Sequence, residues 1–217
     1  MNLLDAPVRE VAWAAIDFEG TGADPGQSDE AVQVGIALLH PGRQEPENFF
    51  RSFVRAESRV TRAASAVHRI TDRDLAHAPP LPLLWPEIKS RLSGTVVFAH
   101  GAGTEKRFLR AFPLHGFGPW IDTLALARAV LPALEDHSLS SVAAEVGVVD
   151  SIRSACPGLD WHDALFDAVA SLLVAQRIIA RSGLQDFAVA QINNLDAAAC
   201  TAHRAMKSLA RDAGLDG

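Results

Sequence analysis

The stretch Val11-Ala12-Trp13-Ala14-Ala15-Ile16-Asp17-Phe18-Glu19-Gly20 decides the fold. Its first six residues are apolar, which is typical of a buried strand, and we expect a strand over residues 11–17. Side chains two residues apart on a strand share a face, so Asp17 and Glu19 would stand side by side where the strand reaches the surface. Two close carboxylates repel each other, and a bound Mg²⁺ would neutralise both. A solvated strand end is the alternative, because isolated Asp-x-Glu pairs are common.

Further strands and helices are expected on either side of this strand. Residues 31–39 and 48–54 are strand-like runs joined by a turn, and such short links favour an antiparallel meander. Short strands at residues 95–99 and around Ile121 follow. Helices are predicted over residues 61–67, from 71, from 83, and over 104–112, 123–131, 138–146 and 163–181. Strands first, then alternating strands and helices, predict an α/β fold with a mixed sheet.

The size and composition indicate one domain with a packed core. The chain has 217 residues, of which 48% are apolar. We expect the domain over residues 1–183, followed by an alanine-rich helical extension over residues 184–217 that packs on or beside it. The net charge of −6 provides no overall positive field and argues against tight, nonspecific duplex binding. An enzyme that holds a few phosphates in a local cleft is compatible with it.

One part of the chain is nevertheless basic. Six arginines fall within 23 residues: Arg51, Arg55, Arg59, Arg62, Arg69 and Arg73. A solvated loop and helix would account for them as well as a phosphate-binding surface would, and the sequence leaves both open.

Cysteine content and hydropathy indicate the compartment. Cys156 and Cys200 are too few and too far apart for a disulfide framework or a zinc motif, so we expect reduced thiols. Residues 1–7 contain no basic start and no apolar signal segment, and no apolar run approaches the ~18 residues of a membrane span. We therefore expect a soluble, cytoplasmic protein that does not bind membranes.

Three further acidic or imidazole side chains lie near predicted helix starts. Glu105 begins the helix after the fourth strand, and His162 and Asp167 flank the start of the long helix. Asp163 and Asp167 form a like-charge pair one helical turn apart, which is mildly destabilising unless something compensates. Each residue alone would ordinarily be a capping or solvated residue. Together with the first pair, carboxylates at three separated places could converge on one metal site.

Five segments, in order, resemble the motifs of the DEDDh (DnaQ-like) 3′–5′ exonucleases. They are Ile16-Asp17-Phe18-Glu19-Gly20-Thr21-Gly22, Val67-His68-Arg69-Ile70-Thr71, Phe98-Ala99-His100-Gly101-Ala102-Gly103-Thr104-Glu105-Lys106-Arg107-Phe108-Leu109, Trp120-Ile121-Asp122-Thr123-Leu124 with Leu126-Ala127-Arg128, and His162-Asp163-Ala164-Leu165-Phe166-Asp167-Ala168. Each motif is weak alone, but the five together span about residues 11–181, most of the chain.

This resemblance implies an RNase H-like exonuclease fold, a mixed five-stranded sheet flanked by helices, and a mechanism with two Mg²⁺ (or Mn²⁺) ions about 4 Å apart. Asp17, Glu19 and Asp167 would ligate the ions directly, with Asp17 bridging them. Glu105 would act through a water molecule. His162 would be the general base that deprotonates the attacking water, because histidine is the side chain that ionises near neutral pH.

The resemblance also implies the substrate and its contacts. Phe18 and His68 would contact the terminal nucleotide, and Thr21 and Arg69 would complete the substrate-binding set. The substrate would be the 3′ end of single-stranded DNA or RNA, with DNA slightly favoured, and the product a nucleoside 5′-monophosphate. No protein partner is indicated.

Some positions depart from the family pattern. Glu105 replaces the usual Asp and is longer by one methylene, Gly101 replaces Asn, Thr104 replaces Phe, and Arg69 replaces Gly. Activity is expected because the ligand set keeps its charge. The alternative is a catalytically weak or inactive nucleic-acid-binding or scaffolding module on the same fold.

Overall fold

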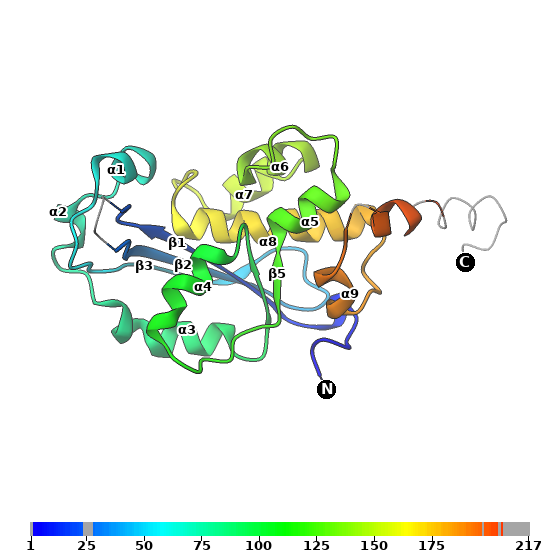
Figure 1. Ribbon diagram of the computed structural model, residues 1–217, viewed down its shortest axis with the longest axis horizontal. Coiled ribbons are helices and arrows are strands. Elements are labelled where there is room, and N and C mark those ends of the chain that lie inside the picture. The colour runs from blue at the N-terminus through cyan, green and yellow to red at the C-terminus, as the bar shows by residue number, and fades with distance from the viewer. Residues whose placement is uncertain (1, 24–27, 197, 204, 206–217) are drawn as a thin grey trace.

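A mixed sheet of five strands lies at the centre of the computed structural model, which describes residues 2–23, 28–196, 198–203 and 205 (Figure 1). The strands are β1 (Trp13–Gly20), β2 (Ala31–Leu39), β3 (Glu47–Phe53), β4 (Val96–Ala99) and β5 (Trp120–Asp122). Their order in the sheet is β3-β2-β1-β4-β5. The first three pair antiparallel, and β4 and β5 run parallel to β1. The expected meander and mixed five-stranded sheet are confirmed.

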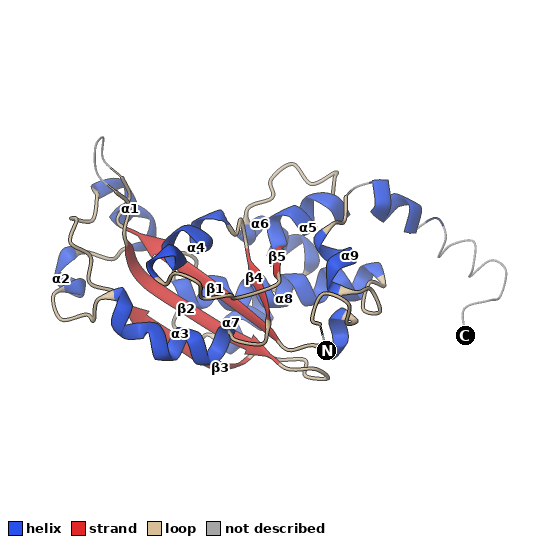
Figure 2. Cartoon of the chain, turned by 60° about the horizontal axis from the view of Figure 1, so that its bottom comes forward, coloured by secondary structure: helices blue, strands red, loops and turns tan. Residues whose placement is uncertain are grey.

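Helices cover both faces of this sheet, as Figures 1 and 2 show. The helices are α1 (Arg62–His68), α2 (Asp72–Leu75), α3 (Trp85–Leu92), α4 (Gly103–Phe108), α5 (Thr123–Val130), α6 (Leu139–Val146), α7 (Val149–Ala155), α8 (Ala164–Ser182) and α9 (Val189–Asn193), with short 3-10 turns η1 (Val8–Glu10), η2 (Leu81–Leu84) and η3 (Leu109–Ala111). The long helix α8 packs along β1 and β2, and α5, α6 and α7 surround it. None of the described helices is long and apolar enough to cross a lipid bilayer.

Alternation of side chains along β1 separates two hydrophobic clusters. Trp13 and Ala15 point into the cluster beneath α8. Ala14, Ile16 and Phe18 point into the opposite cluster, which α3 and α4 cover. Because successive residues face opposite sides, the side chains of residues 17 and 19 continue the α8 face. The alternation therefore directs both carboxylates toward the long helix.

The predicted helix caps at two threonines are present. The Thr61 hydroxyl accepts a hydrogen bond from the Ala64 amide at 3.1 Å, which fixes the start of α1. The Thr71 amide donates to the Asp74 carboxylate at 2.8 Å, as expected for a capping box that uses Asp. These bonds satisfy backbone groups that a helix start leaves unpaired.

Three elements differ from the sequence-based expectation. Strand β1 runs to Gly20, three residues beyond the predicted end, because its ladder with β2 continues to the pair of Gly20 and Ala31. The helix expected over residues 104–112 is shorter, and η3 replaces its last turns. Helix α7 was not predicted, since it has no side-chain cap and buries a single apolar residue, Ile152.

The segment after α8 packs on the N-terminal segment. The Val8 amide donates to the Phe187 carbonyl at 2.8 Å, and the Val189 amide donates to the Ala6 carbonyl at 3.0 Å. Leu184 and Ile192 join the cluster beneath α8. Of the expected helical extension, residues 189–193, 198–203 and 205 are helical and residues 184–188 and 194–196 are not, while residues 197, 204 and 206–217 lie outside the described residues. The division of the chain at residue 183 stays a prediction.

The start of α8 approaches the sheet most closely at Gly35 of β2. A Cβ atom at this position would lie 2.1 Å from the Ala164 carbonyl carbon and 2.2 Å from the Leu165 nitrogen. Atoms cannot approach so closely, so only glycine allows this contact between the helix start and the sheet. Gly35 pairs directly with Asp17 of β1. The contact therefore places the first turn of α8 beside the first carboxylate.

We expect Gly35→Ala to lower the free energy of unfolding by about 3 kcal/mol, because the added methyl group overlaps backbone atoms that cannot rotate away. Gly103→Ala is the matched control, since a Cβ atom there meets nothing within 4 Å. Its free energy of unfolding should stay within about 1 kcal/mol of the wild-type value. Urea unfolding followed by circular dichroism measures both. Equal midpoints for Gly35→Ala and the wild type would show that the close approach is wrong.

Candidate active site

Two strands position the first pair of carboxylates. Asp17 and Glu19 lie within β1, not beyond its end, and pair with Gly35 and Gln33 of β2. Directly paired residues in an antiparallel ladder share a face. Gln33 is therefore beside Glu19 on the side covered by α8, and the space beside Asp17 is left open by a glycine. Both carboxylates are only partly exposed.

A network of polar side chains holds the start of α8 in place. The Asp163 carboxylate caps the helix by accepting a hydrogen bond from the Leu165 amide at 3.1 Å. Gln33 donates to Asp163 at 3.1 Å and accepts from the Ala164 amide at 2.8 Å. The Arg51 guanidinium of β3 binds Asp163 through Nε at 2.8 Å and through Nη2 at 2.5 Å. The positive charge of Arg51 neutralises Asp163 and so offsets the repulsion between Asp163 and Asp167.

The same helix start brings His162 and Asp167 to the β1 carboxylates. The His162 amide donates to the Asp167 carboxylate at 3.2 Å, and His162 has a φ of 66°, a left-handed conformation that is uncommon outside glycine. One ligand atom each of Glu19, His162 and Asp167 lies within 4.8 Å of the others. The imidazole is exposed, whereas Asp167 is only 9% exposed. Residues 143 positions apart in the sequence therefore meet at one site.

Helix α4 supplies the fourth carboxylate, Glu105, which is buried with 3% of its surface exposed. The turn before α4 is fixed by Asp122, whose carboxylate accepts hydrogen bonds from the amides of Gly101 and Ala102 at 3.0 Å each. Gly101 has a φ of 80°. Glycine adopts this conformation freely and Asn does so more readily than most residues, so glycine is sterically suited to a position where the family has Asn.

Burial and nearby negative charges raise the pKa values of all four carboxylates. Burial raises the pKa of Asp17 well above its ordinary value, and the charges of Asp167 and Glu105 raise it further. Burial, followed by the charge of Asp167, raises the pKa of Glu19 to about 8. Burial raises the pKa values of Asp167 and Glu105 to about 7 each. Without a compensating cation, the acids of this site cannot all be ionised comfortably at neutral pH.

The site fits a divalent cation. Glu105 Oε2 and Asp167 Oδ1 are both buried and accept no hydrogen bond from the described residues. A buried carboxylate oxygen without a partner costs free energy, and a hard cation such as Mg²⁺ or Mn²⁺ is the partner that carboxylate oxygens prefer. Asp17, Glu19, Asp167 and Glu105 are the side chains that would hold it.

The four predicted substrate-binding residues lie around the end of β1, in different environments. The Phe18 ring is 5% exposed and packs on Phe108, on the sheet face opposite the carboxylates. Thr21 is buried, and its hydroxyl accepts from the Glu30 amide at 3.0 Å. In the structure both side chains make core and loop contacts, and their contacts with substrate stay predictions.

His68 and Arg69 lie at the end of α1. His68 Nε2 donates to the Gly20 carbonyl at 3.0 Å, since Nδ1 accepts from the Ile70 amide. Burial lowers the pKa of His68, which favours the neutral ring that this pattern requires. Arg69 is exposed and has a φ of 65°. That left-handed conformation explains physically why glycine suits this position in the family pattern.

Sequence reasoning missed several residues that position the site. Gln33 and Gly35 carried no recognisable signal, and Asp122 was noted only as part of the fourth motif, because the roles of all three depend on strand register and on contacts between distant elements. Arg51 was noted only as part of the basic run. The like-charge pair of Asp163 and Asp167 was the one signal that a nearby cation such as that of Arg51 was needed.

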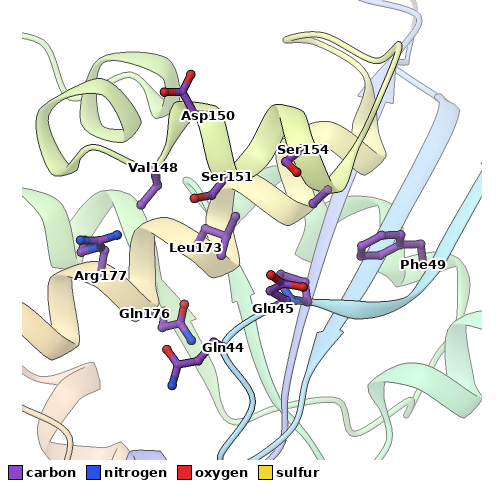
Figure 3. A pocket seen from close by; sticks show the side chains of 12 residues that line it. Gln44, Glu45, Phe49, Val148, Asp150, Ser151, Ser154, Leu173, Gln176 and Arg177 are labelled. Carbon is purple, nitrogen blue, oxygen red and sulfur yellow. The ribbon is translucent and has the colours of Figure 1, made fainter.

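A separate pocket of about 650 Å³ lies between the β2–β3 connection, α7 and α8 (Figure 3). Phe49, Leu173 and Arg177 line it together with the acidic Glu45 and Asp150. It contains none of the converging carboxylates, so its chemistry is not that of the site at the start of α8.

The raised pKa values predict how pH and metal affect stability. In the unfolded chain Glu19 ionises near its ordinary pKa of about 4.3. The folded protein therefore binds the extra proton up to about pH 8, and increasing pH through this window destabilises the metal-free fold. We expect Glu19→Gln to have a higher Tm than the wild type in EDTA, by a margin that grows from pH 5 to pH 8.

Addition of Mg²⁺ at pH 8 should raise the Tm of the wild type more than that of Glu19→Gln, because only the wild type keeps the complete ligand set. Differential scanning fluorimetry at both pH values, with EDTA and with Mg²⁺, measures these differences. A Tm difference that does not change with pH or with metal would contradict the assignment of Glu19 to the site.

Comparison with known proteins agrees with this geometry. A family model described as an exonuclease (RNase_T) matches residues 14–175. The chain is 29% identical over 181 residues to a DNA polymerase III subunit epsilon-like protein of Rhodobacter capsulatus. The aligned region covers 82% of this chain and 25% of that protein. It is 30% identical over 149 residues to a PolC-type DNA polymerase III of Thermotoga petrophila, covering 66% of this chain and 11% of that protein. The chain thus spans a quarter or less of these relatives.

Solved structures show the same fold. Exonuclease X in complex with 5′ overhanging duplex DNA has a TM-score of 0.66 and 25% identity, covering 84% of this chain and 99% of that one. The nuclease domain of 3′hExo, a DEDDh family member bound to rAMP, has a TM-score of 0.65 and 18% identity, covering 81% and 94%. These similarities confirm the RNase H-like exonuclease fold, and the chain belongs to the DEDDh, DnaQ-like exonuclease family.

Proposed function

We propose that this protein is a divalent-metal-dependent 3′–5′ exonuclease that releases nucleoside 5′-monophosphates from single-stranded nucleic acid ends. The observation that carries the proposal is the convergence of Glu19, His162 and Asp167 within 4.8 Å, beside Asp17 and the buried Glu105. An acidic site that combines buried carboxylates with an exposed imidazole suits hydrolysis of a phosphodiester.

The carboxylates would hold the metal. Asp17, Glu19 and Asp167 are the direct ligands in this proposal, and Glu105 would contribute through water. Two bound Mg²⁺ or Mn²⁺ ions would supply electrostatic stabilisation of the attacking and leaving oxygens of an in-line displacement. The buried oxygens Glu105 Oε2 and Asp167 Oδ1, which have no hydrogen-bond partner among the described residues, support the proposal that a cation binds here.

His162 would act as the general base. Its imidazole is exposed, and the hydrogen bond from its backbone to Asp167 fixes it next to the carboxylates. The ring would accept a proton from the water that attacks phosphorus, while the bond from phosphorus to the 3′ oxygen of the preceding nucleotide breaks. The left-handed backbone of His162 supports a role beyond folding, because such conformations concentrate at functional sites.

The substrate is proposed to be the 3′ end of DNA, with RNA second. Relatives carry DNA polymerase III names, and Exonuclease X was solved with duplex DNA, whereas 3′hExo was solved with rAMP. His68, Arg69, Thr21 and Phe18 remain the proposed substrate-binding set. The cytoplasm is the compartment that the proposal expects.

A nucleic-acid-binding module without turnover is the second candidate. Glu105 replaces the Asp of the family pattern, and neither Glu105 nor Asp17 belongs to the group of ligand atoms within 4.8 Å among the described residues. If these two side chains did not reach the metal, the protein would bind nucleic acid and leave it intact.

A 5′-labelled single-stranded oligonucleotide separates these candidates. With Mg²⁺ or Mn²⁺ the wild type should shorten it stepwise from the 3′ end, and Asp17→Asn should abolish cleavage while circular dichroism shows an unchanged fold. Lack of shortening with either ion, together with retained binding, would support the module. Full turnover by Asp17→Asn would remove Asp17 from the mechanism.

For His162→Ala we expect a loss of kcat of about 10²-fold or more, because the attacking water loses its base. Metal binding should be largely preserved, and the rise in Tm that Mn²⁺ induces measures it. His162→Gln is the matched control that keeps a polar side chain without the base. A kcat within a factor of two of the wild type in both variants would show that another group activates the water.

A further inference from the structure

The described surface carries a local excess of positive charge, of which only Arg51 and Arg69 have been given a place at the site. Residues 51–73 contain six arginines and two acidic residues, in a chain whose net charge is −6. Arg51 is accounted for by its ion pair with Asp163. Four others, Arg59, Arg62, Arg69 and Arg73, lie in and around α1 and α2, and we call them the α1–α2 arginines.

All four α1–α2 arginines are exposed. None of their guanidinium groups forms an ion pair or a side-chain hydrogen bond with another residue of the described ranges. By contrast, Arg51 on β3 forms an ion pair with Asp163 at the start of α8, and Arg107 on α4 forms one with Asp29 before β2. The fold therefore does not require the charges of the α1–α2 arginines.

These arginines lie next to the reaction centre. His68 at the end of α1 donates to the Gly20 carbonyl at 3.0 Å, and the Thr61 amide at its start donates to the Thr21 carbonyl at 2.8 Å. Both acceptors follow Glu19 on the chain by no more than two residues. Figures 1 and 2 show α1 and α2 at the end of the molecule where β1 ends. Helix α1 is thus bonded at one end to the last residue of the strand that carries the first carboxylates, and at the other end to the residue that follows it.

The surface on both sides of α1 is hollowed. One hollow of about 570 Å³ is lined by Gly22, Thr61, Arg62 and Val67, among others. Another of about 400 Å³ is lined by Val60, Arg62 and Thr71, among others. Arg62 borders both hollows, and Asp72 also lines the second, so a chain that leaves the carboxylate site over α1 would pass a concave surface bordered by Arg62.

We propose that the α1–α2 arginines bind the phosphate backbone of the nucleic acid strand upstream of its reacting 3′ end. The inference rests on the proposed function, because it assumes that the strand enters the carboxylate site. A strand that has its 3′ end at the carboxylates must continue outward, and its phosphates need cations in a protein whose overall charge would repel them. An acidic protein partner would meet the same charges, but the bonds of α1 to β1 favour the strand held by the site itself.

Binding of a fluorescein-labelled 20-nucleotide single-stranded DNA, with Ca²⁺ in place of Mg²⁺, tests the proposal by fluorescence anisotropy. The variant combines Arg59→Gln, Arg62→Gln and Arg73→Gln, and keeps Arg69 because it flanks His68. We expect at least tenfold weaker binding at 50 mM NaCl. The slope of log affinity against log salt should become shallower by about 0.7 for each phosphate that the variant no longer binds.

The matched control combines Arg128→Gln, Arg153→Gln and Arg177→Gln on α5, α7 and α8. These three arginines are also exposed and form no ion pair within the described ranges, so the control removes the same charge elsewhere. Its affinity should stay within about twofold of the wild type. Equally weakened DNA binding in variant and control would show that only the net charge matters, which would contradict the proposal. Unchanged DNA binding in the variant would contradict it directly.

Cleavage with Mg²⁺ separates this inference from the proposed function. The ratio of kcat/KM for the 20-nucleotide strand to that for a dinucleotide, which has no upstream backbone, should fall about tenfold in the variant. Wild-type protein that binds the DNA strand but never cleaves it would contradict the nuclease proposal. The anisotropy comparison would still test whether the arginines bind the strand. Wild-type protein that cleaves, with an unchanged ratio in the variant, would end the arginine proposal alone.

Discussion

The close contact between the start of α8 and Gly35 of β2 is the constraint on which the site depends. Gly35 pairs with Asp17, and a Cβ atom there would overlap the Ala164 backbone. Because the helix backbone lies directly against the sheet, its first turn brings Asp167 to the carboxylates of β1. The glycine therefore leaves room for the helix backbone, and this contact fixes the first turn of α8 beside Asp17.

Assembling these acids is electrostatically unfavourable, and the fold offsets the cost only in part. Burial, together with the charges of neighbouring acids, raises the pKa of Glu19 to about 8 and that of Asp167 to about 7. Arg51 compensates Asp163, one position after His162, and leaves the four carboxylates at the centre without a cation of their own. A protein with such a site gives up stability in the metal-free state and recovers it when a divalent cation binds.

Sequence reasoning predicted the sheet, most helices and the convergence of the acids. Apolar periodicity and the order of motifs can be recognised in the sequence without knowledge of tertiary contacts. It placed Asp17 and Glu19 at the end of β1, whereas the ladder with β2 carries both inside the strand. It gave no sign of the Gln33 bonds to Asp163 and Ala164, which join residues 130 and 131 positions apart and exist only once strand register is set. The motif also does not reveal that alternation along β1 turns the Phe18 ring into the core beside Phe108, and its contact with substrate stays a prediction.

A crystal grown with Mn²⁺ tests the central claim most directly, because the anomalous signal of manganese locates the ions independently of the protein. The account predicts manganese bound by the carboxylates of Asp17, Glu19 and Asp167, with Glu105 facing the ions directly or through water. Saturating Mn²⁺ that leaves these carboxylates without an ion, or that binds only elsewhere on the molecule, would contradict it.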